Sequence, residues 1–139
     1  MVVPNPHADV SAALIQVLSG DPGALPLIKP IALADLREAA TSLRAPLVVT
    51  RTAAVSVVKG LNEAIYSPEQ VQGWASFVRR GYVANPGGGP IRPLDIAYED
   101  AWEEAIAASV SRLDEIGDVV DGEVTRGEVL DLLQLLGEP

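Results

Sequence analysis

The 139-residue chain is 48% hydrophobic and 21% charged, which excludes an intrinsically disordered protein and favours one globular domain. It contains no cysteine, which excludes disulfides, thiolate metal ligands and a cysteine nucleophile. Its net charge is −9, and the excess is confined to one part of the chain. Residues 1–83 carry seven basic and six acidic side chains (+1), whereas residues 84–139 carry three basic and thirteen acidic ones (−10).

The first predicted elements are two helices separated by a loop. Apolar residues at helical spacing lie between Asp9, a suitable N-cap, and Gly20, a typical helix stop, so we expect a first helix there. Residues 1–8 are expected to form a disordered tail. Three prolines predict a loop over residues 21–30. Apolar residues then recur every three or four positions and predict a second helix near 31–44.

The middle of the chain combines an ambiguous segment with a strong helix signal. Residues 46–66 are rich in β-branched side chains, but their apolar residues share one helical face, which predicts a helix from about Thr50 or Thr52. A short strand near 47–50 remains an alternative. The sequence Ser67-Pro68-Glu69-Gln70 combines a hydroxyl N-cap, a proline at the first helical position and a capping-box glutamine. It predicts a helix whose apolar stripe continues to Tyr82 and which is stopped by the loop that begins at Asn85-Pro86.

The acidic part begins after a Pro/Gly-rich loop expected at residues 84–94. Residues 95–117 are predicted to form the longest helix, with Tyr98 and Trp102 on its apolar stripe. A turn over 117–123 and a capping box from Thr125 to Glu128 precede a final helix that ends at Gly137. The sequence therefore predicts an all-α, single-domain bundle of about six helices.

The motifs for catalysis and metal binding are incomplete. His7 is the only histidine, so neither a zinc cluster nor a Ser-His-Asp triad can be assembled. Asp121, Gly122 and Glu128 match positions of a calcium-binding loop, but the first and third ligand positions would be Gly117 and Val119, which lack side-chain oxygens. We expect no enzyme activity, no metal and no cofactor.

The clustered negative charge predicts a binding function instead. A field of this sign repels nucleic acids and acidic membranes and attracts cationic proteins. We therefore expect a cytoplasmic, non-enzymatic protein that binds a cationic protein partner, and the sequence leaves a homodimer open. Seven acidic residues are expected to form the binding face: Glu99, Asp100, Glu103, Glu104, Asp114, Glu115 and Asp118.

Two other functions are kept as alternatives. Residues 53–80 could form a helix-turn-helix that binds DNA as a transcriptional regulator. In that arrangement Gln70, Gln72, Arg79 and Arg80 would face the major groove. The second alternative is a small-molecule-binding protein or enzyme, which would need a concave polar pocket.

The run from Ser67 to Ala75, followed by a loop, an acidic helix and a closing helix at Thr125–Leu136, resembles a pattern in small uncharacterised actinobacterial helical proteins. These are similar to bacteriocin-type immunity proteins, which are short, acidic, cytoplasmic bundles that neutralise a basic toxin nuclease. The resemblance covers residues 67–136 and implies a helical bundle with an immunity-like role. It assigns no site residue.

Overall fold

The computed structural model describes residues 8–29, 31, 33–43, 46–81, 94–117 and 123–138. Within these ranges the chain is mostly helical, and the predicted all-α fold with a short strand near residues 47–50 is confirmed. The described residues form seven α-helices, one more than the predicted number of about six. The helices are α1 (Ala8–Leu18), α2 (Leu25–Ile28), α3 (Leu33–Ser42), α4 (Arg51–Asn62), α5 (Pro68–Arg80), α6 (Glu103–Asp114) and α7 (Arg126–Leu135). The remaining elements are strands β1 (Leu47–Val49) and β2 (Ile96–Tyr98) and 3-10 turns η1 (Pro22–Ala24) and η2 (Asp100–Trp102).

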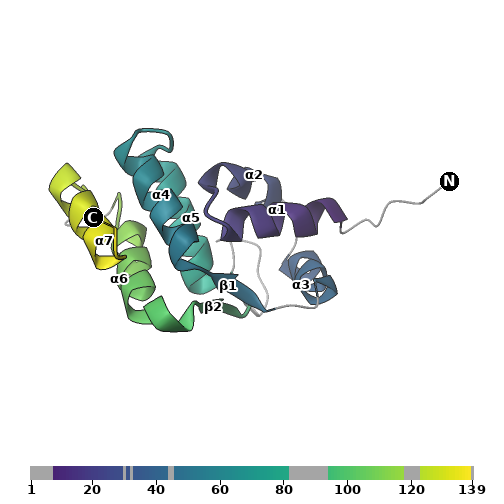
Figure 1. Cartoon of the computed structure of the whole chain (residues 1–139). Helices are drawn as coiled ribbons and strands as arrows, with labels where there is room; N and C mark the ends of the chain where they lie inside the picture. Colours follow the sequence, from purple (N-terminus) through teal and green to yellow (C-terminus); the bar gives the residue numbers. More distant parts are fainter. Residues whose placement is uncertain are drawn as a thin grey trace.

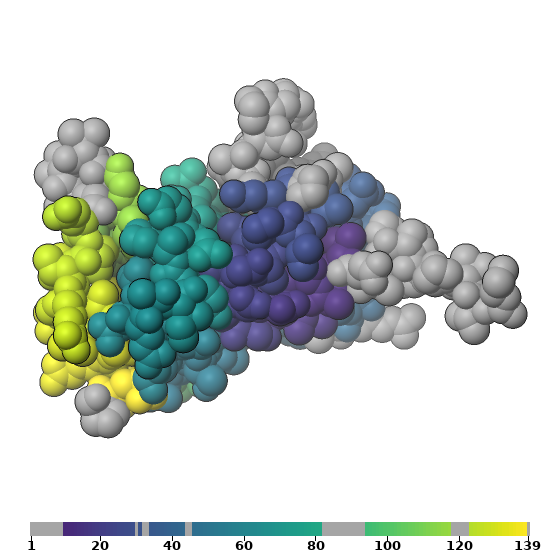
Figure 2. All heavy atoms as spheres, turned by 90° about the horizontal axis from the view of Figure 1, so that it is seen from above, coloured from purple at the N-terminus to yellow at the C-terminus, as the bar shows by residue number. Residues whose placement is uncertain are grey.

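Helices α4 and α5 form the centre of the molecule, with α6 and α7 on one side and α1, α2 and α3 on the other (Figure 1). The closest packing joins α5 to α6, α4 to α7, and α1 to both α2 and α3. A view from above keeps the same order, from the yellow C-terminal segment through the teal centre to the purple N-terminal helix (Figure 2). The acidic segment therefore packs directly on the two central helices.

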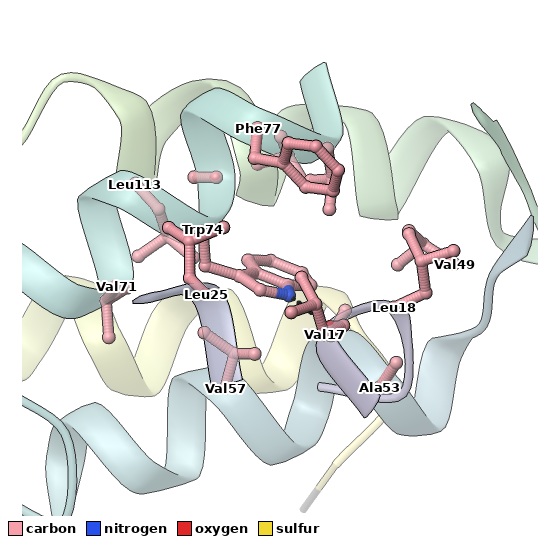
Figure 3. Close-up of a cluster of buried hydrophobic side chains, with 14 of the residues drawn as sticks. Val17, Leu18, Leu25, Val49, Ala53, Val57, Val71, Trp74, Phe77 and Leu113 are labelled. Carbon is pink, nitrogen blue, oxygen red and sulfur yellow. Dashed lines mark hydrogen bonds between the residues drawn. The ribbon is translucent and has the colours of Figure 1, made fainter. Parts of the chain in front are cut away.

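Trp74 anchors α5 to α1 in the core. Its side chain is fully buried, and its indole Nε1 donates a hydrogen bond of 2.7 Å to the carbonyl oxygen of Val17 (Figure 3). Val17 lies in the last turn of α1, where carbonyl groups lack partners within the helix. A buried tryptophan needs such an acceptor for its N–H group. Trp74 is therefore a core aromatic whose N–H group is satisfied.

The helix caps were the most predictable local features. Both hydrogen bonds of the capping box between Ser67 and Gln70 are present, and Gly81 ends α5 in a left-handed conformation with φ of 78°. Thr50 caps α4 by accepting a hydrogen bond from the amide of Ala53. These motifs need only neighbouring residues, so tertiary packing did not override them.

The N-terminal part differs from its prediction at two places. Residues 21–30 were expected to be a loop, but they contain η1 and α2. Pro22 and Pro26 lie in the first turns of these elements, where proline is tolerated because an amide there has no partner within the helix. Helix α1 begins at Ala8, so Asp9 lies inside it rather than at the N-cap. The remainder of the expected tail, residues 1–7, lies outside the described residues.

The predicted helix over residues 95–117 is also partly wrong. Its first part is strand β2, which pairs in parallel with β1 in the register Leu47 to Ile96, and it is followed by η2. Only α6 remains helical, and its 12 residues make it shorter than the 13-residue α5. Tyr98 and Trp102 are half-buried, but not on one helical stripe. Most of the expected loop at 84–94 lies outside the described residues.

Candidate functional site

The acidic residues predicted to form one binding face separate into groups with different surroundings. Glu103 and Asp114 are the first and last residues of α6, which places them roughly 16 Å apart along the helix axis. Asp118 lies outside the described residues. Each of the other carboxylates therefore has to be considered with its own neighbours.

Asp114 is used inside the molecule. Its side chain is only 4% exposed, and its Oδ2 accepts a hydrogen bond of 2.9 Å from Arg79, with Arg80 at 3.8 Å. Gln72 donates to Oδ1 of the same carboxylate at 3.0 Å. All three partners come from α5, so Asp114 joins α6 to α5 and is not displayed to solvent.

Glu115 is also paired, at the far end of α6. Its carboxylate lies 3.3 Å from Arg112, which donates a second hydrogen bond of 2.7 Å to Glu128 in the first turn of α7. The Arg112 hydrogen bond is the main reason that the pKa of Glu128 is lowered from its ordinary value. Thr125 caps α7 as predicted, but the Glu128 carboxylate binds Arg112 instead of completing the capping box.

Glu99 has a structural contact at the start of α4. Its Oε1 accepts a hydrogen bond of 3.0 Å from the backbone amide of Arg51, the first residue of that helix. The first amides of a helix have no partners within it, and a carboxylate is favourable there because of the helix dipole. Glu99 therefore helps to hold η2 and β2 against α4.

The Arg51 side chain fixes the neighbouring Trp102 and the end of α7. Its guanidinium carbon lies 5.1 Å from the centre of the Trp102 ring, within the range of a cation–π contact. The same group donates hydrogen bonds to the carbonyl oxygen of Leu136 and to Glu138. Glu138 also pairs with Lys59 at 3.4 Å. Arg51 and Lys59 therefore share Glu138 as an anionic partner.

The remaining predicted residues, Asp100, Glu103 and Glu104, line one open groove of about 650 Å³ at the start of α6. All three side chains are exposed, and they form no ion pair with any basic side chain that the structure describes. The rest of the lining is apolar and comes from η2, α6 and α7: Ala101, Trp102, Ala105, Ala108 and Leu135. We call this site the acidic groove.

Sequence reasoning found the acidic rim of this groove but missed its apolar lining. Leu135 is 48% exposed because it lies off the buried stripe of α7, which contains Val129, Leu132 and Leu136. The position of Leu135 outside this apolar stripe was the sequence signal that could have indicated an exposed apolar side chain here. Ala105 and Ala108 gave no signal, because alanine is common on any face of a helix.

Two other hollows lie near α3 and β1. The larger, of about 820 Å³, is open to solvent and has polar lining residues that include Arg37, Glu38 and Asp95. The smaller, of about 260 Å³, is mainly apolar and lies between α1 and β1, with Ile15 and Val48 in its lining.

The described residues contain no cluster of histidine, aspartate or glutamate suited to a metal ion. Of the calcium-loop residues, Asp121 and Gly122 lie outside the described residues.

The residues proposed for DNA reading are engaged within the protein. Gln70 completes the α5 capping box, while Gln72 and Arg79 bind Asp114, with Arg80 close by. The side of α5 that carries Gln72 and Arg79 therefore faces α6. A recognition helix would have to release these contacts before it could enter a major groove.

No family model, curated protein or solved structure matches the chain. Among the described helices, none combines the length and the apolar character needed to cross a lipid bilayer. The groove and its chemistry are therefore the features of the described residues that bear on function.

Proposed function

We propose that this protein is a non-enzymatic binding protein that holds a cationic protein partner at the acidic groove. The observation that carries the proposal is the exposure of Asp100, Glu103 and Glu104 without a described basic partner, beside the apolar surface of Leu135. Exposed carboxylates in the first turn of α6 also stabilise that helix through its dipole. That effect does not neutralise them, so their field still extends into solvent.

The physical role of this charge would be to speed and orient association. Complementary charges raise the encounter rate, whereas a few apolar contacts at the centre of an interface supply most of the affinity. Such a role fits an immunity-like or antitoxin-like protein that neutralises a basic toxin in the cytoplasm. The chain's net charge of −9 supports the same direction of attraction.

The test compares two triple variants that change the net charge equally. The first neutralises the groove with Asp100→Asn, Glu103→Gln and Glu104→Gln. The control, Asp35→Asn, Glu63→Gln and Glu69→Gln, neutralises three exposed carboxylates on other helices or their ends. Partners captured by cross-linking in native lysate are identified by mass spectrometry, and their association rates are then measured by stopped flow.

We expect a basic partner that the control variant retains and the groove variant loses. Its association rate with the unmodified protein should fall at least tenfold as salt rises from about 0.05 M to about 0.5 M, because mobile ions screen exposed charges. An association rate that does not change with salt, or equal capture by both variants, would contradict the proposal.

The DNA-binding alternative has less support, because Gln72 and Arg79 are already bound to Asp114. A gel-shift assay with genomic fragments at low salt tests it, and retardation by the unmodified protein would favour it.

Small-molecule binding would use the polar hollow beside α3. Substitution of Arg37, an exposed residue in its lining, would then weaken binding of the ligand.

A further inference from the structure

We infer that the acidic groove accepts one face of a basic amphipathic helix, with an apolar side chain of that helix packed against Leu135 and Trp102. This inference rests on the proposed function and adds the form of the partner.

The groove lies between helices that make little direct contact with each other. Helix α4 packs against both α6 and α7, whereas direct packing between α6 and α7 is slight. At the far end, Arg112 bridges the two helices by its hydrogen bond to Glu128. At the groove end the lining includes three small side chains, Ala101 of η2 and Ala105 and Ala108 of α6. Ala105 and Ala108 lie about 5 Å apart along the α6 axis, so side chains one turn apart on a docked helix can meet them.

The lining also favours a helix over an extended segment. The groove walls are formed by η2, α6 and α7, whose backbone groups are largely bonded within their own turns. An extended peptide would find no strand edge there to pair with its backbone. A helix satisfies its own backbone and can place a row of side chains against small residues.

The chemistry of the groove sets the sequence of that helix. Its apolar floor requires at least one large aliphatic side chain, and Leu135 offers an exposed surface for it to cover. The rim of Asp100, Glu103 and Glu104 requires lysine or arginine on the flanks. Arg51, which lies over the Trp102 ring, is held by Glu138 and therefore leaves the rim acidic.

The probe is a synthetic peptide of about 14 residues with leucines on one helical face and lysines on the other. A scrambled peptide of the same composition has equal charge but no continuous apolar face. Binding of each fluorescently labelled peptide is measured by anisotropy. We expect the amphipathic peptide to bind about tenfold more tightly than the scrambled one, because only the former buries aliphatic surface in the groove.

Two leucines of α7 supply a matched pair of variants. Leu135 and Leu130 are 48% and 49% exposed, but only Leu135 lines the groove. Leu135→Gln should weaken binding of the amphipathic peptide about tenfold, whereas Leu130→Gln should change it less than twofold. Ala108→Gln, which adds an uncharged side chain to the floor, should also weaken binding. Circular dichroism checks that each variant is folded.

The possible failures separate the two proposals. If the scrambled peptide binds equally well and the two leucine variants behave alike, the groove does not select an amphipathic helix. The proposed function would still stand if the triple variant Asp100→Asn, Glu103→Gln and Glu104→Gln no longer bound either peptide. If that triple bound both peptides as well as the unmodified protein does, the proposed function and this inference would both be overturned.

Discussion

Asp114 and the carboxylates of the acidic groove should have opposite effects on stability and binding. Asp114 is almost fully buried and is held by Arg79 and Gln72, whereas Glu103 and Glu104 are exposed. Asp114→Asn keeps the shape of the side chain but removes its charge. We therefore expect this variant to lose stability and to retain partner binding.

The size of the loss follows from the contacts. Hydrogen bonds to a charged group contribute about 1.5–3 kcal/mol each, but the Arg79 and Arg80 side chains are 50% and 48% exposed. Water can solvate them when the carboxylate is gone, which reduces the loss. We expect Asp114→Asn to lower the free energy of unfolding by about 1.5 kcal/mol, and Tm by roughly 6 °C for a chain of this size.

Thermal unfolding followed by circular dichroism measures the change in stability. Fluorescence anisotropy with the labelled amphipathic peptide measures the change in binding. Asp131→Asn is the control, because Asp131 is an exposed carboxylate on α7, and its Tm should change little. Glu103→Gln combined with Glu104→Gln should weaken binding with only a small loss of Tm. The reasoning is refuted if Asp114→Asn leaves Tm unchanged, or if it weakens binding as much as the Glu103 and Glu104 changes do.

Two further predictions concern the backbone and the pH response. Gly20→Ala should lower the free energy of unfolding by about 2–4 kcal/mol, because φ is +98° and the new Cβ would lie 2.5 Å from the carbonyl oxygen of Ala53. Gly117→Ala, at φ of +90° with no described atom within 4 Å, should lower the free energy of unfolding by only about 1 kcal/mol. Urea titration measures both losses, and equal losses would contradict the close approach of Gly20 to Ala53. Because Arg112 lowers the pKa of Glu128, the stabilising contribution of this pair is present above the ordinary pKa of 4.5 and is lost as pH falls through the lowered value. A carboxyl NMR titration should show a low midpoint that rises in Arg112→Gln, whereas the same midpoint in both proteins would argue against the pair.

The accuracy of the sequence predictions depended on how local each signal was. The Ser67–Gln70 capping box needs only residues within one turn and formed as predicted. The helix expected from about Thr50 or Thr52 begins directly after Thr50, which caps it. Strand β2 was mistaken for helix because Tyr98 and Trp102 are four residues apart, which is also helical spacing. Its actual structure depends on pairing with β1, almost fifty residues earlier in the chain, so no local pattern could have revealed it.

The binding face was only partly predictable for a related reason. The sequence divides into a part of charge +1 and a part of charge −10, but this division is not a boundary in space. Helix α5 packs along α6, and its residues Arg79 and Arg80 form ion pairs with Asp114. Charge counted along the chain therefore overestimates the charge displayed on the surface.

Ion pairing within the protein also explains why the negative electrostatic field should be local rather than spread along α6. The carboxylates towards the end of α6 are paired with Arg79 and Arg112, and Glu99 is bound to the start of α4. Among the predicted face residues that the structure describes, only Asp100, Glu103 and Glu104 keep both exposure and an unpaired charge, and they lie beside apolar surface. A partner recognised there needs cationic and aliphatic side chains on one surface, so a highly basic but wholly polar protein should bind weakly and dissociate fast.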